Sequence, residues 1–216
     1  MIFKRVKNFL LDLIFPRLCA GCGRSGVLVC AECLGRMVIE NKRMTFGGSD
    51  LDELLVAIRY EKNSLIQKLI FLFKYHYSRD LAEILGQFLV SLFEQYNHFP
   101  RDRIVVTFVP MHKKREKFRG FNHAESLAKC FGAKTGLTVM KILKRTRNTQ
   151  EQAQLKRSER LVNLKDSFKF LGASLEGKIV VLVDDVSTTG TTLTECSKVL
   201  KENGAGYVIG LVLCHG

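Results

Sequence analysis

The clearest hydrophobic pattern in the chain is an unbroken apolar run, Ile179–Val183, in which four of the five residues are β-branched. A run without polar alternation is typical of a strand buried on both faces of a parallel sheet. Residues 104–109 form a second run of this kind, and residues 53–60 and 207–213 contain further apolar strands. Helical periodicity predicts helices between the strands, at residues 62–74, 80–96, 122–136 and 193–203. This alternation of strands and helices predicts an α/β fold built on a parallel sheet.

Weaker patterns fill the remaining segments. We expect residues 34–50 to be a linker with a helical start, 137–143 a short strand and 167–170 an edge strand. The strand at 207–213 is expected to close the sheet. A polar, basic stretch over residues 144–163 reads as a loop and an exposed helix, which near a ligand site would serve as a lid.

The first 16 residues have apolar positions on one helical face and end at Pro16. The apolar stretch is interrupted by Asp12 and is too short to cross a bilayer, and no signal-peptide cleavage site follows it. We expect a helix docked on the rest of the protein. Peripheral contact with a membrane surface is the alternative, because Lys4, Arg5 and Lys7 provide a basic side.

Two adjacent carboxylates, Asp184 and Asp185, directly follow the main apolar run. A loop of small and hydroxyl residues comes next, followed by a helix: Ser187, Thr188, Thr189, Gly190, Thr191 and Thr192. Free N–H groups at a helix start and nearby hydroxyls bind phosphate, whereas paired aspartates repel it and instead accept hydrogen bonds from sugar hydroxyls. A plain strand-to-helix turn would explain the hydroxyl cap but not the two carboxylates. The stretch therefore predicts a ribose 5-phosphate site.

Basic residues crowd the segment after the strand at 104–109: Lys113, Lys114, Arg115, Lys117 and Arg119. We expect this segment to be a loop at a strand end. Ligands of open α/β sheets bind at the carboxyl ends of the strands, so this basic end suits a pyrophosphate group beside the acidic, sugar-binding end. The alternative is a solvated run of charges.

Four of the seven cysteines, Cys19, Cys22, Cys30 and Cys33, form two C-x-x-C pairs. This spacing predicts a tetrahedral Cys₄ zinc site with a structural role, with disulfides or iron as alternatives. Such a short finger relies on metal for its folding energy. The other three cysteines, Cys130, Cys196 and Cys214, lie in apolar contexts and are expected to be buried and reduced, which indicates the cytosol.

The net charge of +13 indicates an anionic partner: phosphates, nucleic acid or a membrane surface. Two classes of nucleotide-binding protein are excluded. No P-loop motif occurs, and the glycines of the G-x-G-x-x-G match at residues 21–26 neither follow a predicted strand nor open a helix.

The acidic pair and its Ser/Thr-Gly loop resemble the ribose-phosphate signature of type I phosphoribosyltransferases. Further segments are similar to one branch of them, the ComF (ComFC-like) family. They include Lys74-Tyr75, Pro110-x-His112, Arg119-Gly120-Phe121-Asn122 and the spaced residues Arg145, Gln152, Leu155, Arg160, Asn163 and Phe168. His123 departs from the pattern, because the family usually has Gln at this position.

The resemblance implies a type I phosphoribosyltransferase fold carrying a small N-terminal Cys₄ finger. We expect residues 1–40 to form the helix and finger and residues 41–216 the transferase-like domain. The resemblance also implies binding of phosphoribosyl pyrophosphate with Mg²⁺, and a role in DNA uptake at the cytoplasmic side of the membrane. It leaves the acceptor and catalytic turnover open.

Site roles follow from the resemblance and the chemistry together. We expect Asp184, Asp185 and Arg119 to be catalytic, and the Ser187–Thr192 loop with Arg115 and Lys117 to bind the phosphoribosyl pyrophosphate. The alternative is a non-catalytic sensor or adaptor that grips single-stranded DNA with its basic surface. Stacking groups for such DNA would be Tyr60, Tyr75, Tyr77 and Phe118. In a third hypothesis the finger docks a partner protein, with a DNA translocase as the candidate.

Overall fold

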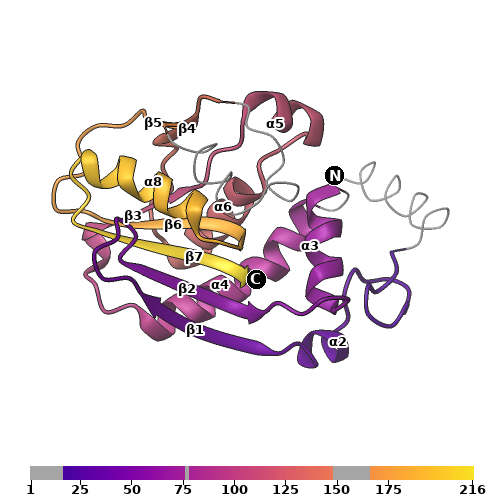
Figure 1. Ribbon diagram of the computed structural model, residues 1–216. Coiled ribbons are helices and arrows are strands. Elements are labelled where there is room, and N and C mark those ends of the chain that lie inside the picture. Colours follow the sequence, from indigo (N-terminus) through magenta and orange to yellow (C-terminus); the bar gives the residue numbers. More distant parts are fainter. Residues whose placement is uncertain (1–16, 76–77, 148–165) are drawn as a thin grey trace.

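The computed structural model describes residues 17–75, 78–147 and 166–216 (Figure 1). Its main sheet has five strands in the order β1-β2-β7-β6-β3, and a separate two-stranded sheet pairs β4 with β5. The strands are β1 (Ile39–Thr45), β2 (Glu53–Arg59), β3 (Ile104–Phe108), β4 (Leu143–Arg145), β5 (Phe168–Phe170), β6 (Ile179–Ser187) and β7 (Tyr207–His215).

Helices cover both faces of the main sheet. They are α2 (Ala31–Gly35), α3 (Leu65–Tyr75), α4 (Ser78–Tyr96), α5 (Lys113–Arg119), α6 (His123–Thr135) and α8 (Thr191–Glu202), with a short 3₁₀ turn η1 (Arg101–Arg103) before β3. Helices α4 and α6 lie together behind the sheet, and α8 crosses in front of it (Figure 1). This three-layer arrangement is the α/β fold that the sequence predicts.

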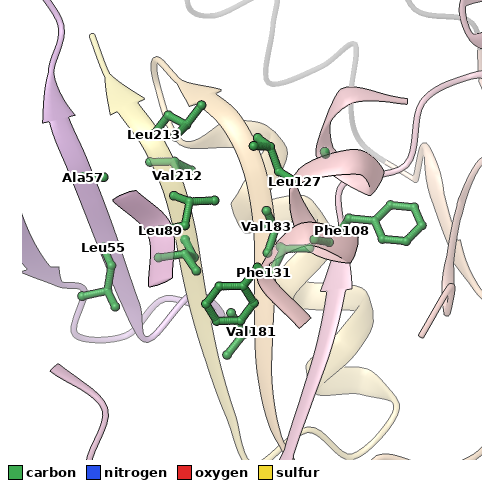
Figure 2. Close-up of a cluster of buried hydrophobic side chains, with 14 of the residues drawn as sticks. Leu55, Ala57, Leu89, Phe108, Leu127, Phe131, Val181, Val183, Val212 and Leu213 are labelled. Carbon is green, nitrogen blue, oxygen red and sulfur yellow. The ribbon is translucent and has the colours of Figure 1, made fainter. Parts of the chain in front are cut away.

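Apolar packing explains why these segments assemble. The central strands β6 and β7 are buried along almost their whole length, as strands covered on both faces require. Figure 2 shows the packing between the sheet and the helices behind it, where Phe131 and Leu89 approach Val181 and Val183. Phe131 also contacts Phe93 edge-on, with ring centroids 5.2 Å apart. A Cβ at Gly210 would lie only 3.0 Å from Leu54 Cδ1 of the neighbouring strand β2, so a glycine here leaves room for that side chain.

The sheet positions the functional residues. Strands β3 and β6 are parallel neighbours, with Phe108 paired to Val183. Their carboxyl ends therefore meet at the same edge of the sheet, and the segments that follow them lie next to each other. This is the edge at which open α/β sheets bind ligands.

One expectation for the N-terminal half was wrong. Residues 34–50 are not a linker, because β1 lies there and pairs antiparallel with β2. The sheet is therefore mixed, although β2, β7, β6 and β3 are parallel to one another as expected. The charged residues of β1 conceal its strand pattern, and such residues are typical of an edge strand, which must avoid pairing with other chains.

Other expectations need smaller corrections. The basic segment after β3 is the helix α5 and not a loop. Residues 137–142 form only an isolated bridge, Val139 to Val106, and Leu143 begins β4, which pairs with β5 outside the main sheet. Strand β7 does not close the sheet but lies inside it, between β2 and β6. Cys196 and Cys214 are buried as expected, whereas Cys130 is only half-buried.

The helix expected over residues 1–16 lies outside the described residues, as does most of the lid expected over residues 144–163. None of the helices in the described ranges has the length and apolar character needed to span a bilayer.

Candidate functional site

The acidic pair forms the last part of β6. Asp184 and Asp185 are not in a loop, because β6 continues to Ser187. Each carboxylate is held by the next backbone amide: Asp185 N–H donates to Asp184 Oδ1 at 2.9 Å, and Val186 N–H donates to Asp185 Oδ1 at 2.7 Å. These bonds fix the orientation of both carboxylates and leave the second oxygen of each for other partners.

The hydroxyl-rich loop links β6 to α8. Gly190 caps the helix with φ of 76°, a left-handed conformation that favours glycine. Thr189 Oγ1 and Thr191 Oγ1 lie 2.8 Å apart, which brings the loop hydroxyls together. The loop surrounds a small pocket of about 20 Å³, lined by Asp184 and the residues from Val186 to Leu193. A pocket of this kind at the start of an α-helix suits a phosphate group.

The basic side of the site comes from the segment after β3. Helix α5 ends at Gly120, whose φ is 83°, and Asn122 then caps α6 by accepting from Ala124 N–H. The Asn122 side chain also donates to Val109 O at 3.1 Å and so ties the start of α6 to the end of β3. This turn directs Arg115 and Arg119 toward the acidic pair.

The two sides face each other across a cleft of about 360 Å³. The cleft brings together five of the residues that the sequence predicts to be catalytic or ligand-binding: Asp184, Asp185, Arg115, Arg119 and Thr192. The remaining loop residues line the adjoining small pocket. Lys117 is exposed on α5 and is not part of the cleft lining. The cleft also contains Lys74, Tyr75, His123 and Arg145, to which sequence reasoning gave no role in the site.

Lys74 is the clearest of these additions. Its Nζ lies 3.0 Å from Asp185 Oδ2, so Lys74, named from the sequence only as part of the family resemblance, is an ion-pair partner of the site. The buried His123 ring approaches Lys74 O at 3.1 Å through Nε2. Next to Lys74, Tyr75 accepts a hydrogen bond from Arg119 at 3.4 Å, with the guanidinium 5.4 Å from the centre of the ring. The Lys74-Tyr75 dipeptide was the only sequence signal for this contribution from α3.

Burial and neighbouring charge set the protonation of the site. Burial, followed by the Asp185 carboxylate, raises the pKa of Asp184 to about 8. Burial also acts to raise the pKa of Asp185, but Lys74 and then His123 outweigh it, and this pKa lies below its usual value. The same ion pair raises the pKa of Lys74. Burial lowers the pKa of His123, so this ring is neutral at physiological pH.

The four predicted zinc ligands form a compact cluster. The Sγ atoms of Cys19, Cys22, Cys30 and Cys33 lie within 4.8 Å of one another. Backbone amide hydrogen bonds, first of all at Cys22, lower the pKa of Cys19 to about 6, which favours the thiolate that a metal needs. A Cβ at Gly21 would lie 2.6 Å from Cys33 Sγ, so the knuckle requires a residue without a side chain. The donor set and its spacing fit a tetrahedral metal ion such as Zn²⁺.

The segments that form the site are similar to known proteins. The phosphoribosyl transferase domain model matches residues 117–216, which include α5, α6 and the whole acidic loop. Competence protein ComFC of Bacillus subtilis is 28% identical over 198 residues, which cover 90% of this chain and 75% of ComFC. The chain is similar to this competence protein over most of its length. The structure combines a phosphoribosyltransferase fold with a four-cysteine cluster that precedes it in the chain.

Other proteins similar to this chain carry related names. Competence protein F of Haemophilus influenzae is 32% identical over 143 residues, covering 65% of this chain and 62% of that protein. DNA utilization protein YhgH of Escherichia coli K12 is 38% identical over 117 residues, covering 53% of this chain and 49% of YhgH. The chain therefore aligns with about half the length of YhgH. Among solved structures, glutamine phosphoribosylpyrophosphate amidotransferase from B. subtilis matches 61% of this chain and 25% of that protein, with 25% identity and a TM-score of 0.41.

Proposed function

We propose that this protein is a member of the ComF family, that it binds phosphoribosyl pyrophosphate with Mg²⁺, and that it acts in DNA uptake during natural transformation, on the cytoplasmic side of the membrane. One observation carries the ligand assignment. A single cleft places two oriented carboxylates opposite arginines and beside a hydroxyl-lined pocket at a helix start. Ribose hydroxyls, a pyrophosphate and a 5-phosphate are the three groups that such an arrangement recognises. The competence names of the relatives support the cellular role.

Each part of the ligand has a place in this proposal. Asp184 and Asp185 accept hydrogen bonds from the ribose hydroxyls through their cleft-facing oxygens. The loop from Ser187 to Thr192 holds the 5-phosphate, and Ser187 Oγ is a buried hydroxyl with no hydrogen-bond partner among the described residues. Arg115 and Arg119 neutralise the pyrophosphate, with Lys117 as a peripheral cation. Mg²⁺ would supply charge neutralisation through pyrophosphate and ribose oxygens, with Asp184 or Asp185 as the protein ligands.

The reaction class that fits this cleft is phosphoribosyl transfer. The bond from the anomeric carbon to pyrophosphate breaks, a bond to a nucleophilic acceptor forms, and the ribose ring carries positive charge in between. The residues would act by positioning and by charge: the arginines stabilise the departing pyrophosphate, and the carboxylates stabilise the cation-like sugar. The acceptor is the open part of this proposal, and a binding protein without turnover is the alternative.

Calorimetric titration of the zinc-loaded protein tests the ligand assignment. We expect phosphoribosyl pyrophosphate with Mg²⁺ to bind more tightly than ribose 5-phosphate, because only the former reaches the arginines. Affinity should rise with pH between about 7 and 9, because the Asp184 carboxyl, with a pKa of about 8, gains its negative charge in this range and then attracts the ribose hydroxyls and Mg²⁺ more strongly. Equal affinity for the two ligands, or affinity that falls as pH rises, would contradict the assignment.

The surface of α5 favours a second function, binding of single-stranded DNA. The outer side of this helix carries exposed Lys113, Lys114 and Lys117 around Phe118, whose residue surface is 85% exposed. Tyr75, which is 46% exposed, lies on the same side of the cleft through its contact with Arg119. Exposed aromatic rings among lysines are the groups on which bases stack while the backbone is neutralised. In this second proposal the phosphoribosyl site serves only for regulation.

Replacing Phe118 by alanine is expected to weaken single-stranded DNA binding about tenfold, since one stacked base is worth about 1–3 kcal/mol. Fluorescence anisotropy with a labelled oligonucleotide at low salt measures the effect. Leu171→Ala is the matched control, because Leu171 is also a large exposed apolar residue but lies after β5. An unchanged affinity in the Phe118 variant would remove α5 from the DNA-binding surface.

We also propose that residues 1–40 serve as a docking module for a partner protein, with a DNA translocase as the candidate, and that residues 41–216 carry the ligand site. The positive charges of Lys4, Arg5 and Lys7 in the sequence are compatible with peripheral contact at the inner face of the membrane. Co-purification of such a translocase with the full chain, and its loss from a chain that lacks residues 1–40 and is shown by a thermal melt to remain folded, would support this module. Retention of the partner by the shortened chain would contradict it.

A further inference from the structure

The ion pair between Lys74 and Asp185 occupies the position at which a metal ion would contact the acidic pair. Asp185 Oδ1 is taken by the Val186 amide, so Oδ2 is the oxygen left for a cation. This atom is buried and accepts no hydrogen bond among the described residues, and Lys74 Nζ lies 3.0 Å away from it. The ammonium therefore compensates a carboxylate that would otherwise be a buried, uncompensated charge.

The surroundings hold Lys74 in this place. It lies in the last turn of α3, directly after Phe73, which is fully buried. The His123 ring fixes the Lys74 carbonyl and packs edge-on against Phe73, with ring centroids 5.5 Å apart. The Lys74 side chain is only 26% exposed, and its ammonium remains next to the cleft where phosphates are expected.

We infer that Lys74 acts as a built-in counter-ion that keeps free divalent metal out of the acidic pair until the phosphorylated ligand arrives. An ammonium and a divalent ion cannot share one carboxylate oxygen without strong repulsion. When a pyrophosphate enters the cleft, its oxygens offer Lys74 a new partner, and Asp185 becomes available to the metal that the ligand brings. This inference rests on the proposed function, and it makes Lys74 a positioning residue for metal and ligand together.

The inference predicts a gain of metal binding on removal of the ammonium. With Mn²⁺ alone as the probe, followed by electron paramagnetic resonance on zinc-loaded full-length protein, the Lys74→Met variant should bind about tenfold more tightly than the unaltered protein, because the fraction of open sites rises. Lys74→Gln is a second variant that tests the same loss of charge. Lys68→Met, at an exposed position of the same helix, is the matched control and should bind Mn²⁺ like the unaltered protein.

Two further variants test whether the gain of Mn²⁺ binding arises at Asp185 and from the loss of the positive charge. Lys74→Arg keeps a positive charge and should leave Mn²⁺ binding weak, whereas adding Asp185→Asn to Lys74→Met should abolish the gain. No gain in either neutral variant, an equal gain in Lys74→Arg, or a gain that survives Asp185→Asn would overturn the inference. Because phosphoribosyl pyrophosphate is absent from these titrations, their outcome is independent of whether that ligand binds. Failure of the ligand titration with a normal Mn²⁺ gain would instead count against the proposed ligand alone.

Discussion

The double variant Asp184→Asn/Asp185→Asn is expected to lose binding of phosphoribosyl pyrophosphate with Mg²⁺ by at least about a hundredfold. Each carboxylate is proposed to accept a charge-assisted hydrogen bond from ribose, and such bonds contribute about 1.5–3 kcal/mol each. An amide can still accept through its oxygen, but it brings no charge to the sugar or the metal. Calorimetric titration under the conditions used for the unaltered protein measures the loss.

The matched control for this variant is Asp102→Asn, because Asp102 is exposed on η1 at the amino end of β3, away from the cleft. The double variant leaves Lys74 without its carboxylate, which costs stability. A thermal melt must therefore show that the variant is folded at the temperature of the titration. A folded double variant with unchanged affinity would refute the assignment of the acidic pair to ribose.

Removal of metal from the cysteine cluster is expected to unfold the finger and lower the stability of the whole protein. Four thiolates within 4.8 Å of one another repel once the metal is gone, and structural zinc sites contribute about 10 kcal/mol or more to folding. Leu28 and Val29, in the segment between the two cysteine pairs, are buried and part of the continuous core, so loss of the finger exposes apolar surface of the main domain as well. We expect one Zn²⁺ per chain by elemental analysis and a clear fall in melting temperature after chelation.

Cys30→Ser tests the same site by mutation. It removes the ligand that also caps α2 by accepting from Cys33 N–H. Cys130→Ser is the matched control, since Cys130 is half-buried on α6 and lies outside the cluster. A chain that contains no metal, or one that melts at the same temperature with and without chelator, would contradict a structural zinc site.

The parts of the fold that the sequence predicts well are those in which one physical signal dominates. The runs that become β3 and β6 are buried on both faces, so their apolar character is continuous. Strand β1 was missed because only one side of it is paired and its exposed charges break the alternation. Helix α5 was read as a loop because its charges form no apolar stripe, and none of its residues is buried.

The site was predictable where chemistry follows directly on a strand, and not where it comes from a distant helix. The acidic pair and the Gly190 loop are consecutive in the chain, so their chemistry can be read from their order. Lys74 reaches Asp185 only because the fold brings the end of α3 near the end of β6, and a lone lysine in the last turn of an apolar helix carries no local sign of this. Arg145 likewise enters the cleft from β4 through tertiary packing.

The position of β7 has a consequence for synthesis on the ribosome. It is the last strand along the described chain, yet it pairs with β2, more than a hundred residues earlier, and separates β2 from β6. The nascent chain therefore holds β2 and β6 without their shared neighbour until translation of this segment is complete. Sequence-distant pairings of this kind form slowly and leave strand edges exposed in the meantime. The cysteine cluster, whose ligands are close in sequence, is free to bind metal and fold long before the sheet is assembled.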